Sequence, residues 1–212
     1  AELPLGWSTV DMGAAFIVLG MVFYMLDGRL DRLTRSTSSL GAQLDSMADM
    51  VTFGVAPAFL ALQLIGLRAP FLSERGDFYF DRLVLVISAI YICCAGLRLA
   101  RFNLETTSGA VEDHLAFQGL PTPGAAGTVA SLVLLQQKFV HMTEVREFVQ
   151  WPWRITTVAM VAVMLLVAFA MVSRLRYVHV MNRYMRGRAS FTYVARVVVV
   201  ALLLLVEPLG AI

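Results

Sequence analysis

The sequence predicts an all-α integral membrane protein, a polytopic helical bundle with about six transmembrane helices. The chain has 212 residues, of which 58% are hydrophobic and only 15% are charged, and its mean hydropathy is +0.73. This composition is more apolar than that of soluble domains. The apolar residues also gather in runs that approach or exceed the roughly 20 residues a helix needs to cross a bilayer. We therefore expect a single membrane domain over residues 1–212.

The apolar runs define the expected spans in order. A short lead-in precedes them, with Trp7 placed at the headgroup level. The expected spans cover residues 12–26, 40–67, 83–100, 119–137, 155–172 and 192–206. Within the second span, Pro57 predicts a kink and Gly54 adds slack. Residues 68–82 are expected to form a polar loop, and small residues near Gly124 predict close helix contact in the fourth span.

The arginines and the lysine predict the orientation of the bundle. Cytoplasmic loops of membrane proteins carry an excess of basic residues. If residues 27–39 lie in the cytoplasm and the spans alternate, eleven of the seventeen basic residues fall on that side and six on the other. The formal net charge of +2 gives no indication of a nucleic-acid partner.

Acidic residues at the end of the first span and the start of the second form the main candidate site. They are Asp27, Asp31, Asp45 and Asp49. Carboxylates at membrane depth cost several kcal/mol unless they are paired or bind metal. Asp45 and Asp49 are four residues apart and share a helix face, and carboxylate oxygens suit magnesium or manganese. Alternatively the acids are solvated loop and cap residues, an interpretation that suits Asp27 and Asp31 better than the other two.

Two glycines accompany these acids. Gly28 directly follows Asp27, and Gly41 lies four residues before Asp45. A glycine lets the backbone turn and lets a ligand approach it closely. Ser39, with its neighbour at 38, suits the N-cap of the second helix. We therefore expect two helices, joined by a short polar turn, with their acids facing each other around divalent cations.

The stretch from Tyr24 to Asp49 resembles the signature of the CDP-alcohol phosphatidyltransferases, D-x2-D-G-x2-A-R-x8-G-x3-D-x3-D. The residues that match, with every spacing kept, are Asp27, Gly28, Arg32, Gly41, Asp45 and Asp49. Further along, GAQLDSMADMVTFGVAPA, RLARFN and FQGLPTPGAAG resemble the bacterial phosphatidylserine synthases of this family. The resemblance covers about residues 14–176.

The resemblance implies transfer of a phosphatidyl group from CDP-diacylglycerol to L-serine, with release of CMP and dependence on Mg²⁺ or Mn²⁺. It implies that Asp27, Asp45 and Asp49 hold the metals and that Asp49 also deprotonates the attacking alcohol. Gly28, Arg32 and Gly41 would contact the nucleotide. It further implies a homodimer in the inner membrane of a prokaryote, with the site facing the cytoplasm. Another acceptor, such as glycerol phosphate or inositol phosphate, and a non-catalytic nucleotide-lipid-binding protein stay open as alternatives.

Two positions depart from the signature. Tyr24 stands where the pattern has its first aspartate, and Asp31 stands where it has alanine. A tyrosine cannot act as a carboxylate ligand at neutral pH. On a continuous helix Tyr24, Asp27 and Asp31 share a face. Two interpretations follow: Asp31 supplies part of the missing charge, or the protein is a weakened or inactive enzyme.

The motif RLARFN near the end of the third span supplies candidate anion ligands. Arg98 and Arg101 are three residues apart and face the same way, and Asn103 follows them. Arginine binds carboxylate or phosphate through two parallel donors, so a serine carboxylate or a lipid phosphate is the expected target. The alternative is that these arginines snorkel to the membrane interface.

Overall fold

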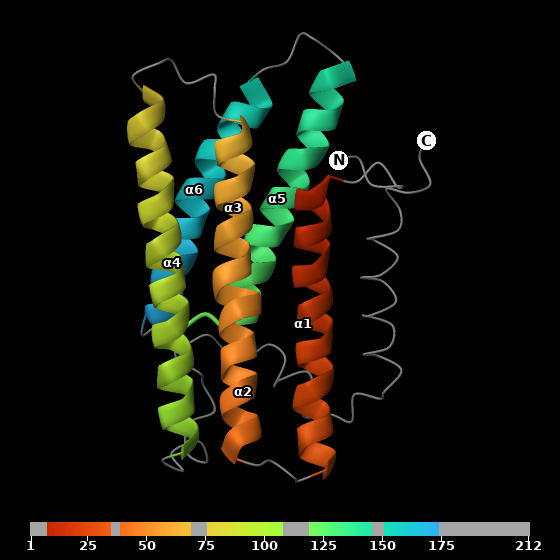
Figure 1. Cartoon of the computed structure of the whole chain (residues 1–212), viewed down its shortest axis with the longest axis vertical. Helices are drawn as coiled ribbons and strands as arrows, with labels where there is room; N and C mark the ends of the chain where they lie inside the picture. The colour runs from red at the N-terminus through yellow and green to blue at the C-terminus, as the bar shows by residue number, and fades with distance from the viewer. Residues whose placement is uncertain (1–7, 35–38, 69–75, 108–118, 146–150, 174–212) are drawn as a thin grey trace.

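A computed structural model of the chain is a bundle of long helices, and no strand occurs in the parts that it describes, residues 8–34, 39–68, 76–107, 119–145 and 151–173 (Figure 1). The helices are α1 (Thr9–Thr34), α2 (Ser39–Asp49), the π-helical segment η1 (Met50–Val55), α3 (Ala56–Arg68), α4 (Gly76–Thr107), α5 (Thr122–Val145) and α6 (Trp151–Val172). Helices α2, η1 and α3 follow one another without a break and form one rod (Ser39–Arg68), as Figure 1 shows. The prediction of an all-α bundle is confirmed.

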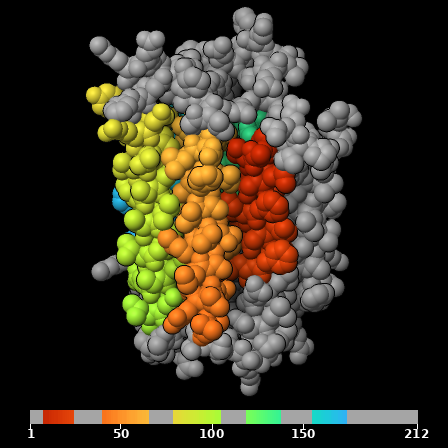
Figure 2. Space-filling model, viewed as in Figure 1, coloured from red at the N-terminus to blue at the C-terminus, as the bar shows by residue number. Residues whose placement is uncertain are grey.

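The bundle has two layers. Figure 1 shows α1, the α2–η1–α3 rod and α4 side by side, with α5 and α6 crossing behind them. In the space-filling view the side chains of these front helices close over one another, so that little of α5 and α6 is seen (Figure 2). Helix α5 packs against α1 and α6, and α6 packs against α4.

Three helices in the described ranges are long and apolar enough to cross a membrane. They are Leu40–Ile65, Tyr79–Leu104 and Ile155–Val172. The apolar part of α1, Thr9–Tyr24, is shorter than a full span. These helices confirm a polytopic membrane protein. The expected sixth span, residues 192–206, and Trp7 lie outside the described residues.

Two expectations about turns were wrong. Gly28 was expected to allow a turn, but α1 continues through it to Thr34. One glycine costs a helix only about 1 kcal/mol, and the leucines and arginines around it favour helix, so the helix does not end there. Residues 68–82 were expected to be a loop, but α4 already begins at Gly76. After Gly76 that stretch holds no further glycine or proline, and the apolar helix extends back through it.

Small residues let the helices approach closely, as is usual in membrane bundles. A Cβ added to Gly13 of α1 would lie 2.6 Å from the Leu60 side chain of α3. A Cβ on Gly127 of α5 would lie 2.8 Å from the Met21 side chain of α1. The predicted small-residue face of α5 therefore packs inside one chain, and it no longer supports the predicted homodimer.

The loop before α5 is anchored to the end of α6. Gly119 has a φ of +87°, a conformation that favours glycine, and a Cβ there would lie 2.4 Å from the Met171 carbonyl oxygen. The Leu120 amide donates a hydrogen bond to the Ala170 carbonyl, 3.0 Å away. The motif GLPTPG thus begins α5 where the sequence placed the start of the fourth span.

Candidate active site between α1, α2 and α4

Of the four candidate aspartates, the structure describes the side chains of two, Asp45 and Asp49, near the end of α2. Asp45 is exposed, and Asp49, the final residue of α2, is half-buried. The two lie four residues apart on a regular helix and therefore on one face, as the sequence predicted. Helix α2, which carries them, forms the lower part of the rod in Figure 1, beside the end of α4 and the second half of α1.

Tyr24, at the position of the first signature aspartate, lies beside this acidic face. Its phenol is within electrostatic range of the Asp49 and Asp45 carboxylates and of the Arg98 guanidinium. Its ring packs edge-on against the ring of Phe53, with 5.6 Å between the centroids and 83° between the planes. The departure from the signature therefore falls within the candidate site itself and places a neutral phenol among its charged groups.

Arg98 brings a positive charge from α4 to the same place. Only 6% of this residue is exposed, and its guanidinium lies 5.9 Å from the centre of the Phe102 ring. A snorkelling arginine keeps its charged end in water, which does not fit such burial. A buried charge requires an opposite charge or hydrogen bonds nearby, and Asp45 and Asp49 lie on the facing helix. Arg101, one turn further on, is half-buried.

Asn103 joins the end of α4 to α2. Its Nδ2 donates a hydrogen bond to Ser46 Oγ over 2.9 Å, and Ser46 Oγ donates in turn to Asn103 Oδ1 over 3.2 Å. Ser46 follows Asp45 directly in the chain. The amide expected to contact a ligand therefore fixes the α4 end against the acidic turn of α2. Sequence reasoning missed Ser46, although its place between two signature aspartates was a signal.

The remaining predicted ligands lie on the second half of α1, whose side chains are not described. The backbone there is a continuous helix, so Asp27 and Asp31 share a face with Tyr24, three and seven residues before them. The side chains of Asp27, Asp31 and Arg32 lie outside the described residues, and so does Ser38. Their roles stay predictions. Gly41 lies exposed on the first turns of α2.

Two carboxylates can supply only part of a metal site. Among the side chains that the structure describes, no group of three or more His, Cys, Asp or Glu residues could hold a metal ion. Asp45 and Asp49 offer the hard oxygen ligands that Mg²⁺ and Mn²⁺ prefer. The chemistry of this pair fits such an ion, and the further carboxylates that the sequence predicts belong to α1.

The backbone changes its helical form directly after Asp49. Residues Met50–Val55 are π-helical, and the Ala56 amide donates to the Val51 carbonyl, five residues back. Such segments are rare and often occur at functional sites. The segment ends two residues before Pro57, where the sequence predicted a kink. Phe53, in the middle of this segment, is a residue that sequence reasoning missed.

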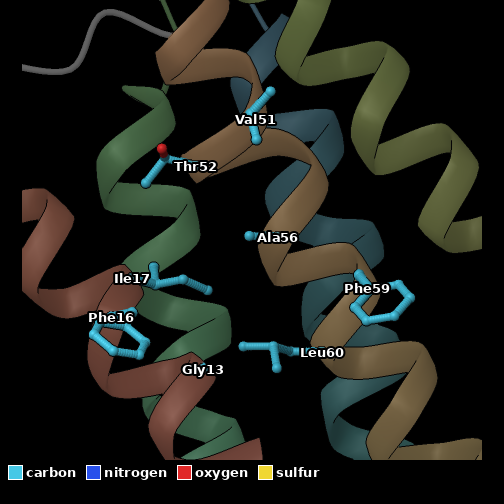
Figure 3. Close-up of a pocket in the computed structure, with 8 residues that line it drawn as sticks. All are labelled: Gly13, Phe16, Ile17, Val51, Thr52, Ala56, Phe59 and Leu60. Atoms are coloured by element: carbon cyan, nitrogen blue, oxygen red, sulfur yellow. The ribbon is translucent and has the colours of Figure 1, made fainter.

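An apolar groove of about 340 Å³ runs between α1 and the rod (Figure 3). It is lined by Gly13, Phe16, Ile17, Val51, Thr52, Ala56, Phe59 and Leu60. In Figure 3 Val51 and Thr52 lie at one end and Gly13 and Leu60 at the other. The groove thus begins two residues beyond Asp49 and continues along helices that are apolar enough to lie in a bilayer.

The helices and this site define an integral membrane protein with a charged cluster on an apolar bundle, next to an apolar groove. The family model of the CDP-alcohol phosphatidyltransferases matches residues 5–152, and the chain belongs to this family.

The chain is similar to several curated proteins named CDP-diacylglycerol–serine O-phosphatidyltransferase. One from Helicobacter pylori is 36% identical over 133 residues, which cover 63% of this chain and 50% of that protein. One from Methanocaldococcus jannaschii is 38% identical over 113 residues, covering 53% and 45%. One from Bacillus subtilis is 32% identical over 119 residues, covering 56% and 58%. The chain spans about half the length of the curated relatives it matches.

Proposed function

We propose that the protein transfers a phosphatidyl group from CDP-diacylglycerol to the hydroxyl of L-serine, giving phosphatidylserine and CMP. The observation that carries this proposal is the convergence of Tyr24, Asp45 and Asp49, three signature positions, beside Arg98 of α4. Family membership and the names of the relatives support the donor and the acceptor.

The acids hold one or two divalent cations, Mg²⁺ or Mn²⁺, in this proposal. When bound, such ions neutralise the diphosphate and stabilise the charge on the departing CMP. Asp45 and Asp49 supply carboxylates from α2, and Asp27 with Asp31 supply them from α1. Asp49 accepts the proton of the serine hydroxyl.

Arginines and backbone at the same place bind the remaining polar groups of the substrates. Arg98 and Arg101, with Asn103 beside them, bind the serine carboxylate or the lipid phosphate through paired donors. Gly28, Arg32 and Gly41 contact the nucleotide, as the family signature implies. The burial of Arg98 next to two carboxylates supports its part, because exclusion of water strengthens its attraction for an anion.

The groove between α1 and the rod receives an acyl chain of the donor. Its lining is apolar, one of its walls is the rod, which is long and apolar enough to span a bilayer, and its first lining residue on the rod, Val51, follows Asp49 by two positions. A lipid can therefore keep its tails in the membrane while its diphosphate reaches the charged groups. We place this end of the bundle at the cytoplasmic face of a prokaryotic inner membrane, and the excess of basic residues on that side supports the orientation. The predicted homodimer stays a prediction.

Tyr24 favours a second candidate, a family member that binds nucleotide-lipid and does not turn it over. A phenol replaces a carboxylate within the acidic cluster, and one metal position loses a ligand. The same chemistry with glycerol phosphate or inositol phosphate as acceptor is a third candidate.

One assay separates these candidates. The full chain, purified in lipid nanodiscs, is incubated with CDP-diacylglycerol, Mn²⁺ or Mg²⁺, and each acceptor in turn, and CMP release is measured. We expect release with L-serine and none without a divalent ion. CDP binding without CMP release, whatever the acceptor, would favour the non-catalytic candidate.

A further inference from the structure

A tyrosine of α4 is bonded to the π-helical segment. Tyr91 is fully buried, and its hydroxyl donates a hydrogen bond to the Phe53 carbonyl oxygen over 3.1 Å. Phe53 lies four residues after Asp49, in the middle of η1. A phenol inside an apolar bundle needs a polar partner, and here that partner is the backbone of the segment that follows the candidate base.

Pro57 explains why this carbonyl accepts a side-chain donor. In an α-helix the Phe53 carbonyl would accept from the amide of residue 57, and that residue is a proline without an N–H. In a bilayer every backbone polar group must find a partner within the protein. Tyr91 supplies the hydrogen-bond donor that the backbone lacks at Pro57.

The surroundings hold η1 on two further sides. A Cβ on Gly20 of α1 would lie 2.9 Å from the Thr52 side chain, and a Cβ on Gly54 would lie 3.3 Å from Ala95 of α4. The Phe53 ring, 2% exposed, meets the Tyr24 ring. The segment is therefore packed between α1 and α4 and bonded to α4 through Tyr91.

The π form of η1 sets the direction in which Asp45 and Asp49 point from α2. A π-helical turn holds about one residue more than an α-helical turn. Closing it to an α-helix would turn the preceding helix relative to α3 by the angle of one residue, about 100°. Asp45 and Asp49 would then turn away from Tyr24 and Arg98.

We propose that Tyr91 is a positioning residue for the reaction. Its bond to Phe53 keeps η1 in the π form and so keeps the carboxylates of Asp45 and Asp49 directed at the metal and the substrate. This role rests on the proposed function, and Tyr91 acts through η1. The competing explanation is that the hydroxyl only satisfies a buried carbonyl and contributes to stability alone.

The first test is Tyr91→Phe, which removes the hydroxyl and keeps the ring. Mutation of a residue that orients a metal ligand without touching the metal lowers metal affinity or activity by about 10- to 100-fold. We expect kcat for CMP release to fall at least about tenfold, with KM for CDP-diacylglycerol within about twofold. Direct Mn²⁺ binding, followed by electron paramagnetic resonance, should weaken by a similar factor. Tyr79→Phe, the same change at an exposed position of α4, is the control and should alter neither quantity.

A second variant separates positioning from stability. In Tyr91→Phe/Pro57→Ala, residue 57 gains an amide that can bond the Phe53 carbonyl and close the α-helix. Positioning predicts that thermal stability returns while kcat and Mn²⁺ binding stay low. Return of all three, or a Tyr91→Phe variant with the kcat and Mn²⁺ affinity of the wild type, would overturn the proposal. If Tyr91→Phe does not fold, the same three quantities are measured on the double variant only.

The outcome for Tyr91 is separable from that of the proposed function. If the unaltered chain releases no CMP, the proposed function fails, and Mn²⁺ binding still reports whether the acids stay aligned. If the unaltered chain is active and the hydroxyl is dispensable for both kcat and Mn²⁺ binding, only the role of Tyr91 fails.

Discussion

Two regions of the bundle differ in the side chains that form them. The acidic junction of α1, α2 and α4 is charged and polar, whereas the contact of α5 with α6 is mostly apolar. At the junction the side chains include one exposed and one half-buried carboxylate, a buried arginine and an amide–hydroxyl pair, next to a helix in π form. The buried side chains of α5 and α6 are mostly alanine, valine and methionine, and Gln136 Nε2 donates a hydrogen bond of 2.7 Å to Thr157 Oγ1 between the two helices.

This difference separates activity from stability within one bundle. Groups that face water or ligand at the junction add little to packing, because buried apolar contact lies mainly elsewhere. None of the residues proposed to bind metal or substrate lies on α5 or α6. We therefore expect changes at the junction to lower activity at nearly constant stability, and changes in the contact to do the reverse.

Asp49→Asn should have the largest effect on the junction. The amide keeps the size of the side chain and loses both the proton acceptor and a charged metal ligand. Loss of a general base alone costs about 100- to 10,000-fold, and we expect CMP release to fall about 1,000-fold. Asp81→Asn, at an exposed acid of α4, is the matched control. Activity within tenfold of the wild type would exclude Asp49 as the base.

Arg98→Lys should have the next largest effect. Lysine keeps the charge and loses the two-pronged donor set of arginine. If one charge-assisted hydrogen bond to the serine carboxylate is lost, at about 2 kcal/mol, KM for serine should rise about 30-fold. The exposed Arg82, changed to lysine on the same helix, serves for comparison. An unchanged KM for serine together with a raised KM for CDP-diacylglycerol would assign Arg98 to the lipid phosphate instead.

Tyr24→Asp should increase Mn²⁺ affinity, whereas the two preceding variants should lower activity. It restores the carboxylate of the family signature beside Asp49 and Asp45, and we expect Mn²⁺ affinity to rise about tenfold. Tyr24→Asn, polar and uncharged, should give no gain. A decrease in affinity would mean that the site is adapted to the phenol.

Asp31 can be tested in the same series. If it compensates for Tyr24, Asp31→Ala should weaken Mn²⁺ binding in the wild type and have little effect in the Tyr24→Asp variant. Equal losses in both backgrounds would show that Asp31 acts independently of position 24.

Apolar runs and helix spacing predicted the bundle well, because both follow from hydropathy and the helical repeat. The rod Ser39–Arg68, the span ending near Val172 and the shared face of Asp45 and Asp49 all follow from those two properties. The continuation of α1 through Gly28 did not, because whether one glycine ends a helix depends on neighbours that propensity cannot describe.

The parts of the junction that sequence missed depend on contacts between distant segments. Pro57 indicated a break, but the donor that bonds the Phe53 carbonyl beside it comes from Tyr91, which lies in another helix. Ser46 and Asn103 are 57 residues apart, and no local pattern pairs them. The burial of Arg98 likewise depends on helices from other parts of the chain that pack against α4, so hydropathy alone could not predict it.

Met164→Ala should have the smallest effect on activity and tests the other side of the comparison. Met164 of α6 is 2% exposed, so truncation removes buried apolar contacts and leaves a cavity. We expect a loss of about 2 kcal/mol in the free energy of unfolding, the lower end for such changes, with kcat within about twofold because the cavity lies outside the junction. Leu166→Ala, on the same helix at 67% exposure, should cost far less stability. If Met164→Ala instead lowers kcat at unchanged stability, the α5–α6 contact helps to hold the acidic junction, and the two regions are not independent.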